Sequence, residues 1–176
     1  MSSDRPVMSP AFRVASVAVL AAVTTVFTYI KLPFAPTRGY FNLGDVAIAF
    51  CAITLGPVTA MISGGIGTAL ADLLGGYPQW APISLVVHGL EGLVIGLVVT
   101  TRRDSVTVQA LGGLIGILVM AGGYFAAEST IMGMGLGPAL AEVPGNIVQS
   151  AAGVILGIPL AFAVSRAYPP VRQWRW

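Results

Sequence analysis

Charged residues are scarce in this 176-residue sequence, and they leave several long stretches without any charge. Asp, Glu, Lys and Arg together make up 9% of the chain, whereas a typical soluble domain has roughly 25%. So few charges cannot cover a water-facing surface, which excludes a soluble globular enzyme. Because 56% of the residues are hydrophobic, the chain is also not disordered. The composition indicates one integral membrane domain. Its charge-free stretches include 14–30, 46–71, 105–127 and 143–165, and only Glu91 interrupts 73–101.

These stretches predict the membrane-spanning helices, because about 20 apolar residues of helix cross the hydrocarbon core of a bilayer. Gly56-Pro57 divides the second stretch, since proline disfavours helix at the residue before it. The turn signal Gly75-Gly76-Tyr77-Pro78 ends the next helix. The sequence therefore predicts an all-α integral membrane protein, a compact bundle of six transmembrane helices with a short second helix. The expected spans are 11–30, 43–55, 58–74, 82–101, 106–131 and 144–167.

Basic residues near the ends of these spans predict the orientation. Seven arginines fall on the side that holds both termini, and only Lys31 and Arg38 fall on the other. Because cytoplasmic loops carry an excess of Lys and Arg, both termini are expected to be cytoplasmic. The chain then divides into an N-terminal tail (1–10), a membrane domain (11–168) and a C-terminal tail (169–176). The seven arginines are Arg5, Arg13, Arg102, Arg103, Arg166, Arg172 and Arg175.

Other classes of site have little support in the sequence. Cys51 is the single cysteine, so neither an internal disulfide nor a cysteine-type metal cluster is expected. The net charge is +2 and the basic residues form no long run, which argues against nucleic acid as a partner. No GK[ST] motif follows the glycine-rich segments, so this chain is not expected to hydrolyse ATP. We expect no catalytic residue, no metal and no cofactor.

Polar side chains in the expected spans gather in the half of the membrane away from the termini. His88 and Glu91 are three residues apart and Tyr124 and Glu128 are four apart, so each pair shares a helix face. Ionisable groups inside a membrane are costly and usually face an internal cavity. We therefore expect a pocket that opens to the outside. Its expected binding residues are Trp80, His88, Glu91, Tyr124, Glu128, Asn146 and Gln149, with Tyr40, Asn42 and Asp72 at the rim or in a lid formed by residues 31–42.

Residues near the helix ends also have structural explanations. Asp45, which follows Asn42-Leu43-Gly44, is favoured as the N-cap of the second helix. Asp72, near a helix end, can be solvated or bonded to a loop. Trp80 can serve as an anchor at the membrane interface.

The deeper polar residues have structural alternatives as well. A lone histidine such as His88 can be a hydrogen-bonded core residue. Glu91 can belong to a structural ion pair or be a protonated buried acid. Hydrogen bonds between helices are an alternative role for Glu128, Asn146 and Gln149.

A stripe of alanines marks the first expected helix. Ala11, Ala15, Ala18 and Ala22 recur at intervals of four and three residues, which places them on one face. Small residues let two membrane helices approach closely. The stripe therefore indicates either packing within this chain or an exposed docking face for a partner membrane protein.

Five segments, taken in their order along the chain, resemble the substrate-binding S components of energy-coupling factor (ECF) transporters. The resemblance is strongest to the riboflavin and hydroxymethylpyrimidine branch. Each motif is short, but together they extend over nearly the whole chain. The segments are 41–48 (FNLGDVAI), 64–77 (GGIGTALADLLGGY), 88–92 (HGLEG), 122–128 (GGYFAAE) and 144–149 (PGNIVQ).

This resemblance implies a multi-pass protein of the prokaryotic plasma membrane that captures a small water-soluble vitamin or precursor from outside. It implies a transmembrane coupling subunit and two cytoplasmic ATPase subunits as partners in the lipid bilayer, and vitamin uptake driven by ATP. In the family, an Ala-x-x-x-Ala motif of the first helix contacts the coupling subunit, and Ala18/Ala22 and Ala11/Ala15 match it. The family often carries lysine near the position of His88, so the identity of the vitamin stays open.

Two other functions remain as alternatives. One is a self-sufficient secondary transporter coupled to protons through Glu91 or Glu128, although the inverted repeats and broken helices of many such folds are not evident. The other is an intramembrane metal enzyme that uses His88 and Glu91, although a zinc site with one histidine would rely on carboxylates. A structural membrane subunit would leave the clustered polar residues unexplained.

Overall fold

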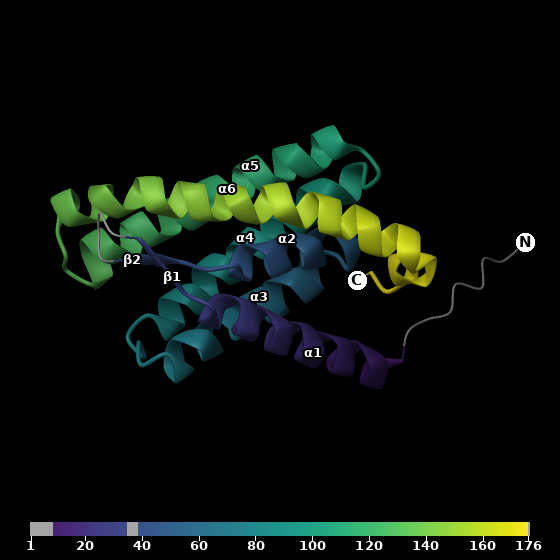
Figure 1. The fold of residues 1–176 in the computed structure, drawn as a ribbon, viewed down its shortest axis with the longest axis horizontal. Coiled ribbons are helices and arrows are strands. Elements are labelled where there is room, and N and C mark those ends of the chain that lie inside the picture. Colours follow the sequence, from purple (N-terminus) through teal and green to yellow (C-terminus); the bar gives the residue numbers. More distant parts are fainter. Residues whose placement is uncertain (1–8, 35–38, 176) are drawn as a thin grey trace, which may run out of the picture.

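Six helices follow one another from Pro10 to Ala167, and they pack side by side as one bundle (Figure 1). The computed structural model describes residues 9–34 and 39–175, with the backbone alone for 32–34 and 39–40. Arg5 and Arg38, used for the orientation, lie outside the described residues, as does the Tyr40 side chain. The helices are α1 (Pro10–Tyr29), α2 (Gly44–Thr54), α3 (Pro57–Leu74), α4 (Ala81–Thr101), α5 (Val106–Ala126) and α6 (Leu136–Ala167).

Five of these helices are long and apolar enough to cross a membrane, and α2 is an apolar helix of 11 residues. The predicted all-α membrane bundle, with its short second helix, is therefore confirmed. The first five helices begin and end within one residue of the predicted bounds, when α5 is taken together with the π-helix η1 (Ala127–Ile131) that continues it. That agreement follows from the sequence, because charged residues, prolines and glycines stand next to most of the helix ends.

Local signals explain where two of the helices begin. The Ser9 hydroxyl accepts a hydrogen bond from the Phe12 N–H at 3.2 Å, and so caps α1. Pro57 stands at the start of α3, where its missing N–H removes no helical hydrogen bond. Gly56, immediately before it, has a φ of 97°, which a residue with a side chain rarely adopts.

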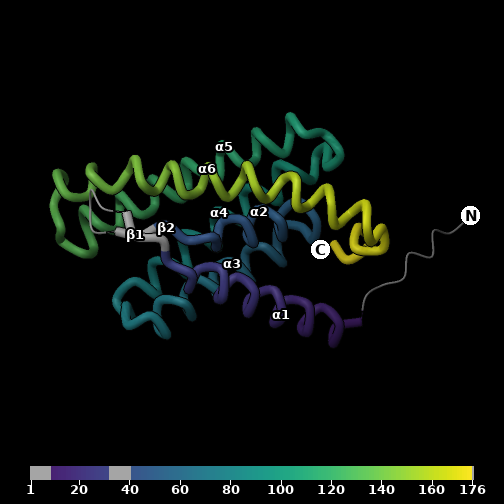
Figure 2. Tube along the Cα trace, in the orientation of Figure 1, coloured from purple at the N-terminus to yellow at the C-terminus, as the bar shows by residue number. Residues whose placement is uncertain are grey.

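The short helix α2 lies at the centre of the bundle, in contact with α1, α3, α4 and α6 (Figure 2). Ten of its 11 residues are buried, including its one charged residue, Asp45. Helices α3 and α4 approach closely: a Cβ placed on Gly92 would lie 2.8 Å from the Ala60 carbonyl oxygen. Such close backbone approach is typical of small residues at interfaces between membrane helices.

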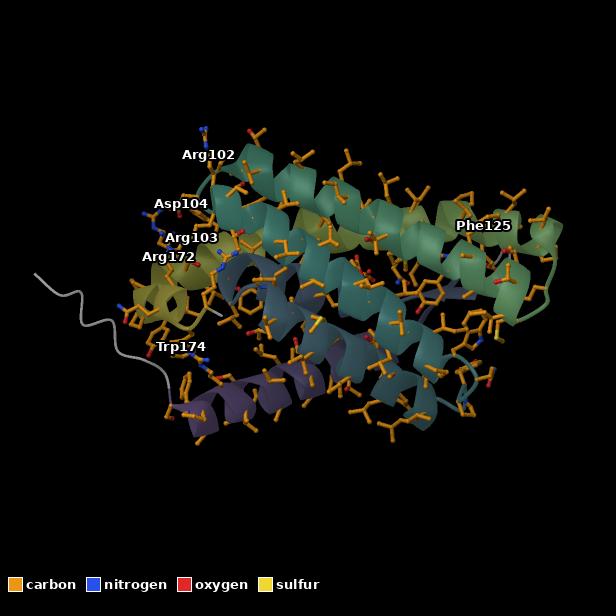
Figure 3. The ribbon with its side chains drawn as sticks, turned by 180° about the vertical axis from the view of Figure 1, so that it is seen from behind. Arg102, Arg103, Asp104, Phe125, Arg172 and Trp174 are labelled. Carbon is orange, nitrogen blue, oxygen red and sulfur yellow. The ribbon has the colours of Figure 1, made fainter. Side chains whose placement is uncertain are left out.

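The two ends of the bundle differ in what they carry. Helix α1 begins and α6 ends at one of them, which we call the terminal end (Figure 1). Arg102, Arg103, Asp104 and Arg172 lie there (Figure 3). At the opposite end, the loop end, two three-residue strands follow α1: β1 (Leu32–Phe34) pairs antiparallel with β2 (Gly39–Phe41).

The sixth helix differs from its prediction. We expected it to begin at 144 after an outer loop of 132–143, but α6 begins at Leu136 and contains Pro144 and Pro159. The prediction placed the start at 144 because the charged Glu142 bounds the uncharged stretch 143–165. Inside a membrane bundle, neighbouring groups satisfy the backbone that a proline frees, so such a helix can continue through it. At 32 residues, α6 is roughly 48 Å long.

The residues after α6 pack against the bundle. They form the 3-10 helix η2 (Pro169–Gln173), whose Val171 is buried in a cluster with Cys51, Ile95 and Ala161. The ring centroid of Trp174 lies 5.0 Å from that of Phe12 in α1. These contacts join the end of the described chain to the start of α1.

Candidate functional site

A cavity of about 270 Å³ lies among the loop-end parts of α3, α4, α5 and α6. This is near the lower limit for small-molecule sites, which are roughly 300–1,000 Å³. Glu91 is the one predicted binding residue that does not line it. The predicted residues that do are Trp80, His88, Tyr124, Glu128, Asn146 and Gln149, with Asn42 and Asp72 from the predicted rim.

Aromatic side chains form one wall of this cavity. The ring centroids of Trp80 and Tyr124 are 6.0 Å apart with their planes at 44°, and the His88 ring meets Tyr124 edge-on at 5.6 Å. The Tyr124 hydroxyl is 2.6 Å from the Ser84 hydroxyl, which fixes the ring orientation. This wall offers apolar, polarisable surface for a flat ligand.

His88 belongs to a buried group of three ionisable side chains. The group consists of Asp45, His88 and Glu91, which are 2%, 3% and 1% exposed. His88 Nδ1 is 2.9 Å from Glu91 Oε2 and 3.8 Å from Asp45 Oδ1. Ser150 donates a hydrogen bond to Glu91 Oε1 at 2.7 Å. A protonated imidazole between the two acids would offset part of the cost of burying them.

The burial of Glu91 therefore has a structural explanation. The side chain lies behind His88 and bonds to His88 and Ser150. Its influence on a ligand would pass through His88, which lines the cavity.

We expected Asp45 to cap α2, but it does not. The N-cap position is occupied by Leu43, and Asn42 Oδ1 accepts from the Gly44 N–H at 2.9 Å instead. The Asp45 side chain turns into the bundle because α2 is surrounded by other helices. There, Asp45 Oδ2 accepts a hydrogen bond from Gln149 Nε2 at 2.8 Å.

Gln149 connects three elements. Its Oε1 accepts hydrogen bonds from both the Asn42 N–H (3.2 Å) and Asn42 Nδ2 (3.1 Å), while its Nε2 donates to Asp45. The amide thus bonds α6 to α2 and to the residue that follows β2. Although Gln149 lines the cavity, its main contacts are with protein groups.

Several polar atoms around the cavity have no hydrogen-bond partner among the residues that the structure describes. They are Thr28 Oγ1, Asp72 Oδ2, Glu128 Oε2 and Asn146 Nδ2. Asp72 and Glu128 are 6% and 4% exposed, so water covers little of either carboxylate. Buried polar groups are normally paired, and a bound ligand would supply the missing partners.

Glu128 lies in the π-helix η1 rather than in regular α-helix. The hydrogen bond that defines this π-helix runs from the Met132 N–H to the Ala127 carbonyl oxygen, five residues earlier, at 2.9 Å. Such wide turns are frequent at functional sites.

The group Asp45, His88 and Glu91 can be tested as a metal site, because its candidate ligand atoms lie within 4.8 Å of one another. However, protein partners already engage His88 Nδ1 and both Glu91 oxygens, and Gln149 engages Asp45 Oδ2. Among the described residues, Asp45 Oδ1 is the one carboxylate oxygen of the group without a hydrogen-bond partner. As they stand, these side chains offer fewer ligands than the three or four of protein zinc sites.

The alanine stripe of α1 lies on the outside of the bundle. Ala11, Ala15, Ala18 and Ala22 are all exposed, whereas the neighbouring Ala21 is buried. The stripe therefore does not pack within the described chain, which removes one of its two explanations.

Sequence reasoning missed part of the cavity wall. Thr68 and Ser84 are ordinary helix residues by pattern, and Met134 and Glu142 fall within the expected outer loop. Glu142 could have been predicted from the sequence, because it is one of only seven acidic residues and lies close in sequence to Asn146. The missed residues are Thr28, Thr68, Tyr77, Ser84, Met120, Met134 and Glu142.

Comparisons with known proteins identify the family and agree with this fold. The model of the family "ECF-type riboflavin transporter, S component" matches residues 11–166. An uncharacterized Pyrococcus woesei protein from a gap 3′ region is 35% identical over 86% of this chain and 100% of its own length. The thiamine precursor transporter HmpT of Lactococcus lactis is 32% identical, over 84% of this chain and 86% of that protein.

A solved structure of the S component of a bacterial ECF transporter has the same fold. It superposes with a TM-score of 0.68 over 90% of this chain and 98% of the other, at 20% sequence identity. The chain is therefore an integral membrane protein and a substrate-binding transporter subunit, not an enzyme. It belongs to the family of ECF-type riboflavin transporter S components.

Proposed function

We propose that this subunit binds a small heteroaromatic vitamin or vitamin precursor in the loop-end cavity and delivers it to an ATP-driven ECF transporter. The observation that carries this proposal is the cavity itself: aromatic rings and unpartnered polar atoms are brought together inside an apolar bundle. Pockets that combine apolar surface with a few convergent polar groups are typical of small-molecule sites. The names of the relatives, a riboflavin family and a thiamine precursor transporter, agree with such a ligand.

The cavity would face outward. The arginines Arg102, Arg103, Arg166 and Arg172 are all exposed and belong to the terminal end or the helix that ends there. By the positive-inside rule that end would be cytoplasmic. The loop end, with Trp80 and Tyr124, would then open to the exterior and take up the ligand there.

The test of capture is ligand identification on the purified protein. Native mass spectrometry should detect a co-purifying heteroaromatic molecule, and Tyr124→Ala together with Trp80→Ala should weaken its binding at least tenfold, because both stacking surfaces are lost. Leu118→Ala, at a position 63% exposed on α5, is the matched control that should bind normally. Undiminished binding by the double variant would remove this cavity as the site.

The coupling subunit would dock on the exposed alanine stripe of α1. Small side chains let a partner helix approach closely, and two cytoplasmic ATPase subunits would then supply the energy. Ala18→Trp should prevent assembly with the coupling subunit while ligand binding stays intact. The control Leu118→Trp should leave both assembly and ligand binding intact. Normal assembly of Ala18→Trp, measured by co-purification, would move the docking face elsewhere.

A proton-coupled secondary transporter is the second candidate, and the buried group of Asp45, His88 and Glu91 favours it. Acid and histidine chains in membrane spans commonly carry protons. Uptake of the ligand into liposomes that contain this subunit alone, driven by a pH gradient, would establish it. Uptake that needs the partner subunits and ATP would establish the ECF mechanism instead.

A further inference from the structure

A second cavity, of about 530 Å³, lies at the terminal end of the bundle and shares no lining residue with the loop-end cavity. We call it the terminal-end cavity. Its wall is formed by the end of α2, the start of α5, the last part of α6 and the segments that follow α4 and α6. The proposed capture of a vitamin does not involve this cavity.

Two arginines lie at the outer part of the terminal-end cavity. Arg103 follows α4 and Arg172 belongs to η2, and both are exposed. Arg103 Nη1 donates to the Arg172 carbonyl oxygen at 3.4 Å, and Gln109 Nε2 donates to the Arg103 carbonyl oxygen at 2.6 Å. These bonds join the segment after α4 to α5 and to η2, so both guanidinium groups are held at one cavity (Figure 3).

Positive charge exceeds negative charge at this cavity. Asp104 is the one acid among the described residues that line it, and Asp104 Oδ1 accepts a hydrogen bond from Arg172 Nη1 at 3.1 Å. Burial lowers the pKa of the nearby Arg175, and the charge of Arg103 lowers that pKa further. An anion would relieve this repulsion, and the planar guanidinium group of arginine is well suited to bind phosphate.

The deeper part of the cavity is apolar. Ile158, Phe162 and Ser165 line it from α6 at intervals of four and three residues, which places them on one helix face. Ile158 is nine residues before the end of α6 at Ala167, roughly 14 Å along the helix axis. Phe162 and Val106 are 61% and 63% exposed, so in a membrane they contact acyl chains. From the end of the bundle inward, the wall therefore changes from charged to apolar.

This order of groups fits an amphiphile better than a small solute. The Arg172 and Asp104 side chains are 49% and 74% exposed, so the charged part of the cavity is not enclosed as the loop-end site is. A free anion would contact the arginines and leave the apolar part unfilled. A membrane phospholipid has the matching order, with a phosphate at the membrane interface and acyl chains beneath it.

We infer that the terminal-end cavity binds an anionic phospholipid of the surrounding membrane. Its phosphate binds Arg103 and Arg172, and one acyl chain lies along Val106, Phe162 and Ile158. Basic pockets between membrane helices bind lipid headgroups in this way.

Two lipids with identical acyl chains test the charge requirement on the unmodified protein. They are dioleoylphosphatidylglycerol, which is anionic, and dioleoylphosphatidylcholine, which is zwitterionic. Native mass spectrometry of the detergent-purified full-length chain, titrated with each lipid, should show about tenfold tighter binding of the first phosphatidylglycerol molecule. Equal affinity for the two lipids would overturn the inference.

A soluble phosphate separates a lipid site from a site for free anions. Glycerol 3-phosphate carries the phosphate without acyl chains, so at the same concentration it should leave the bound phosphatidylglycerol in place. Displacement of the lipid by glycerol 3-phosphate at equal concentration would identify a phosphate site and overturn the lipid assignment.

A pair of double variants locates the headgroup. Arg103→Gln with Arg172→Gln removes both guanidinium groups of the cavity and should weaken phosphatidylglycerol binding about tenfold. The matched control, Arg102→Gln with Arg166→Gln, removes the same charge from exposed residues that do not line the cavity, and should bind the lipid normally. Equal losses in the two double variants would mean a general attraction to the basic end of the bundle, and would remove the cavity as the site.

A further variant tests the apolar part without changing any charge. Ser165→Trp should fill the cavity and weaken phosphatidylglycerol binding, whereas Ala163→Trp, at an exposed position of α6 outside the cavity wall, should not. Unchanged lipid binding in Ser165→Trp would overturn the placement of the acyl chain and the inference with it. Thermal unfolding without lipid checks the fold of each variant, and the comparison of the two lipids on the unmodified protein decides the question if a variant fails to fold.

The other possible occupant of the cavity is a protein partner. If the double variant of Arg103 and Arg172 loses assembly with the coupling subunit but binds phosphatidylglycerol as the unmodified protein does, the cavity is a protein contact and the lipid assignment is wrong. Loss of lipid binding with normal capture of the vitamin would support the inference and show that the two cavities act separately.

Discussion

At the loop end of the bundle, Asp72 and Glu128 are buried, and each has a carboxylate oxygen without a hydrogen-bond partner in the described part of the chain. At the terminal end, Arg172 donates to Asp104 at 3.1 Å, and the two side chains are 49% and 74% exposed. A larger cavity, about 530 Å³, lies beside that pair. Its charged groups pair with one another or face solvent, so the larger opening has less unmet bonding capacity. Burial and missing partners, rather than volume, identify the site.

The difference teaches how a membrane protein uses a small number of charges. Exposed charges can mark a membrane face at little energetic cost, because water solvates them. Buried charges are costly, so they persist only where a network or a ligand compensates them. The variants below compare the two kinds of position, from the largest expected effect to the smallest.

Glu91→Ala should have the largest effect on stability. It removes the partner of both His88 Nδ1 and the Ser150 hydroxyl inside the bundle. Breaking a buried charged pair in this way costs about 3–5 kcal/mol, so thermal unfolding in detergent should shift to a much lower temperature. Glu91→Gln, which keeps the size and an acceptor, should lose less. If the alanine variant unfolds like the wild type, the group is not a stabilising network.

Gln149→Ala should come next. It leaves the Asn42 N–H, Asn42 Nδ2 and Asp45 Oδ2 without the bonds that they make in the structure. The expected loss of unfolding free energy is about 1–3 kcal/mol. Asn146→Ala is the control from the same helix, since Asn146 Nδ2 makes no hydrogen bond to any residue that the structure describes. Equal losses in the two variants would contradict the role of Gln149 in joining α6 to α2.

Tyr124→Phe should have a smaller effect. It removes the hydroxyl that bonds to Ser84 at 2.6 Å, and keeps the ring beside Trp80. A loss of about 0.5–1.5 kcal/mol in unfolding free energy is expected, because the ring still packs. Ser84→Ala should give a similar value, and the double variant should cost little more than either alone. Additive losses would mean that the two hydroxyls do not act as a pair.

Asp104→Asn should have the smallest effect. The Arg172–Asp104 pair is exposed on both sides, and exposed pairs contribute less than about 1 kcal/mol. The small difference from wild type should vanish in 1 M salt, which screens exposed charges. A loss as large as that of Gln149→Ala would contradict the contrast between the two ends.

Much of the fold could be predicted because the bilayer imposes it. A span needs a run of apolar residues, and Asp45, Asp72, Asp104 and Arg166 limit such runs in the sequence. The start of α6 could not be found in this way, because the charged Glu142 bounds the uncharged run and yet lies inside the helix.

The candidate site was predictable in its members and less so in its bonds. Buried polar residues such as His88 and Glu128 stand out in an apolar chain, whatever their partners. The role of Asp45 was missed because its neighbours suggest a local cap, while its partners, His88 and Gln149, are 43 and 104 residues away in sequence. Contacts at such distances depend on helix packing, which no local pattern records.

The π-helix that carries Glu128 gives the loop end an unusual sensitivity to chain length. The hydrogen bonds of the π-helix 127–131 each span five residues, whereas those of an α-helix span four. Deleting a single residue there would let ordinary α-helix run through, and would turn the two flanking segments relative to each other by about 100°. Tyr124 and Met132 both contact the cluster around Met120 and Ile83, and they could not then both keep that contact. At this turn, the number of residues fixes the geometry as firmly as their identity does.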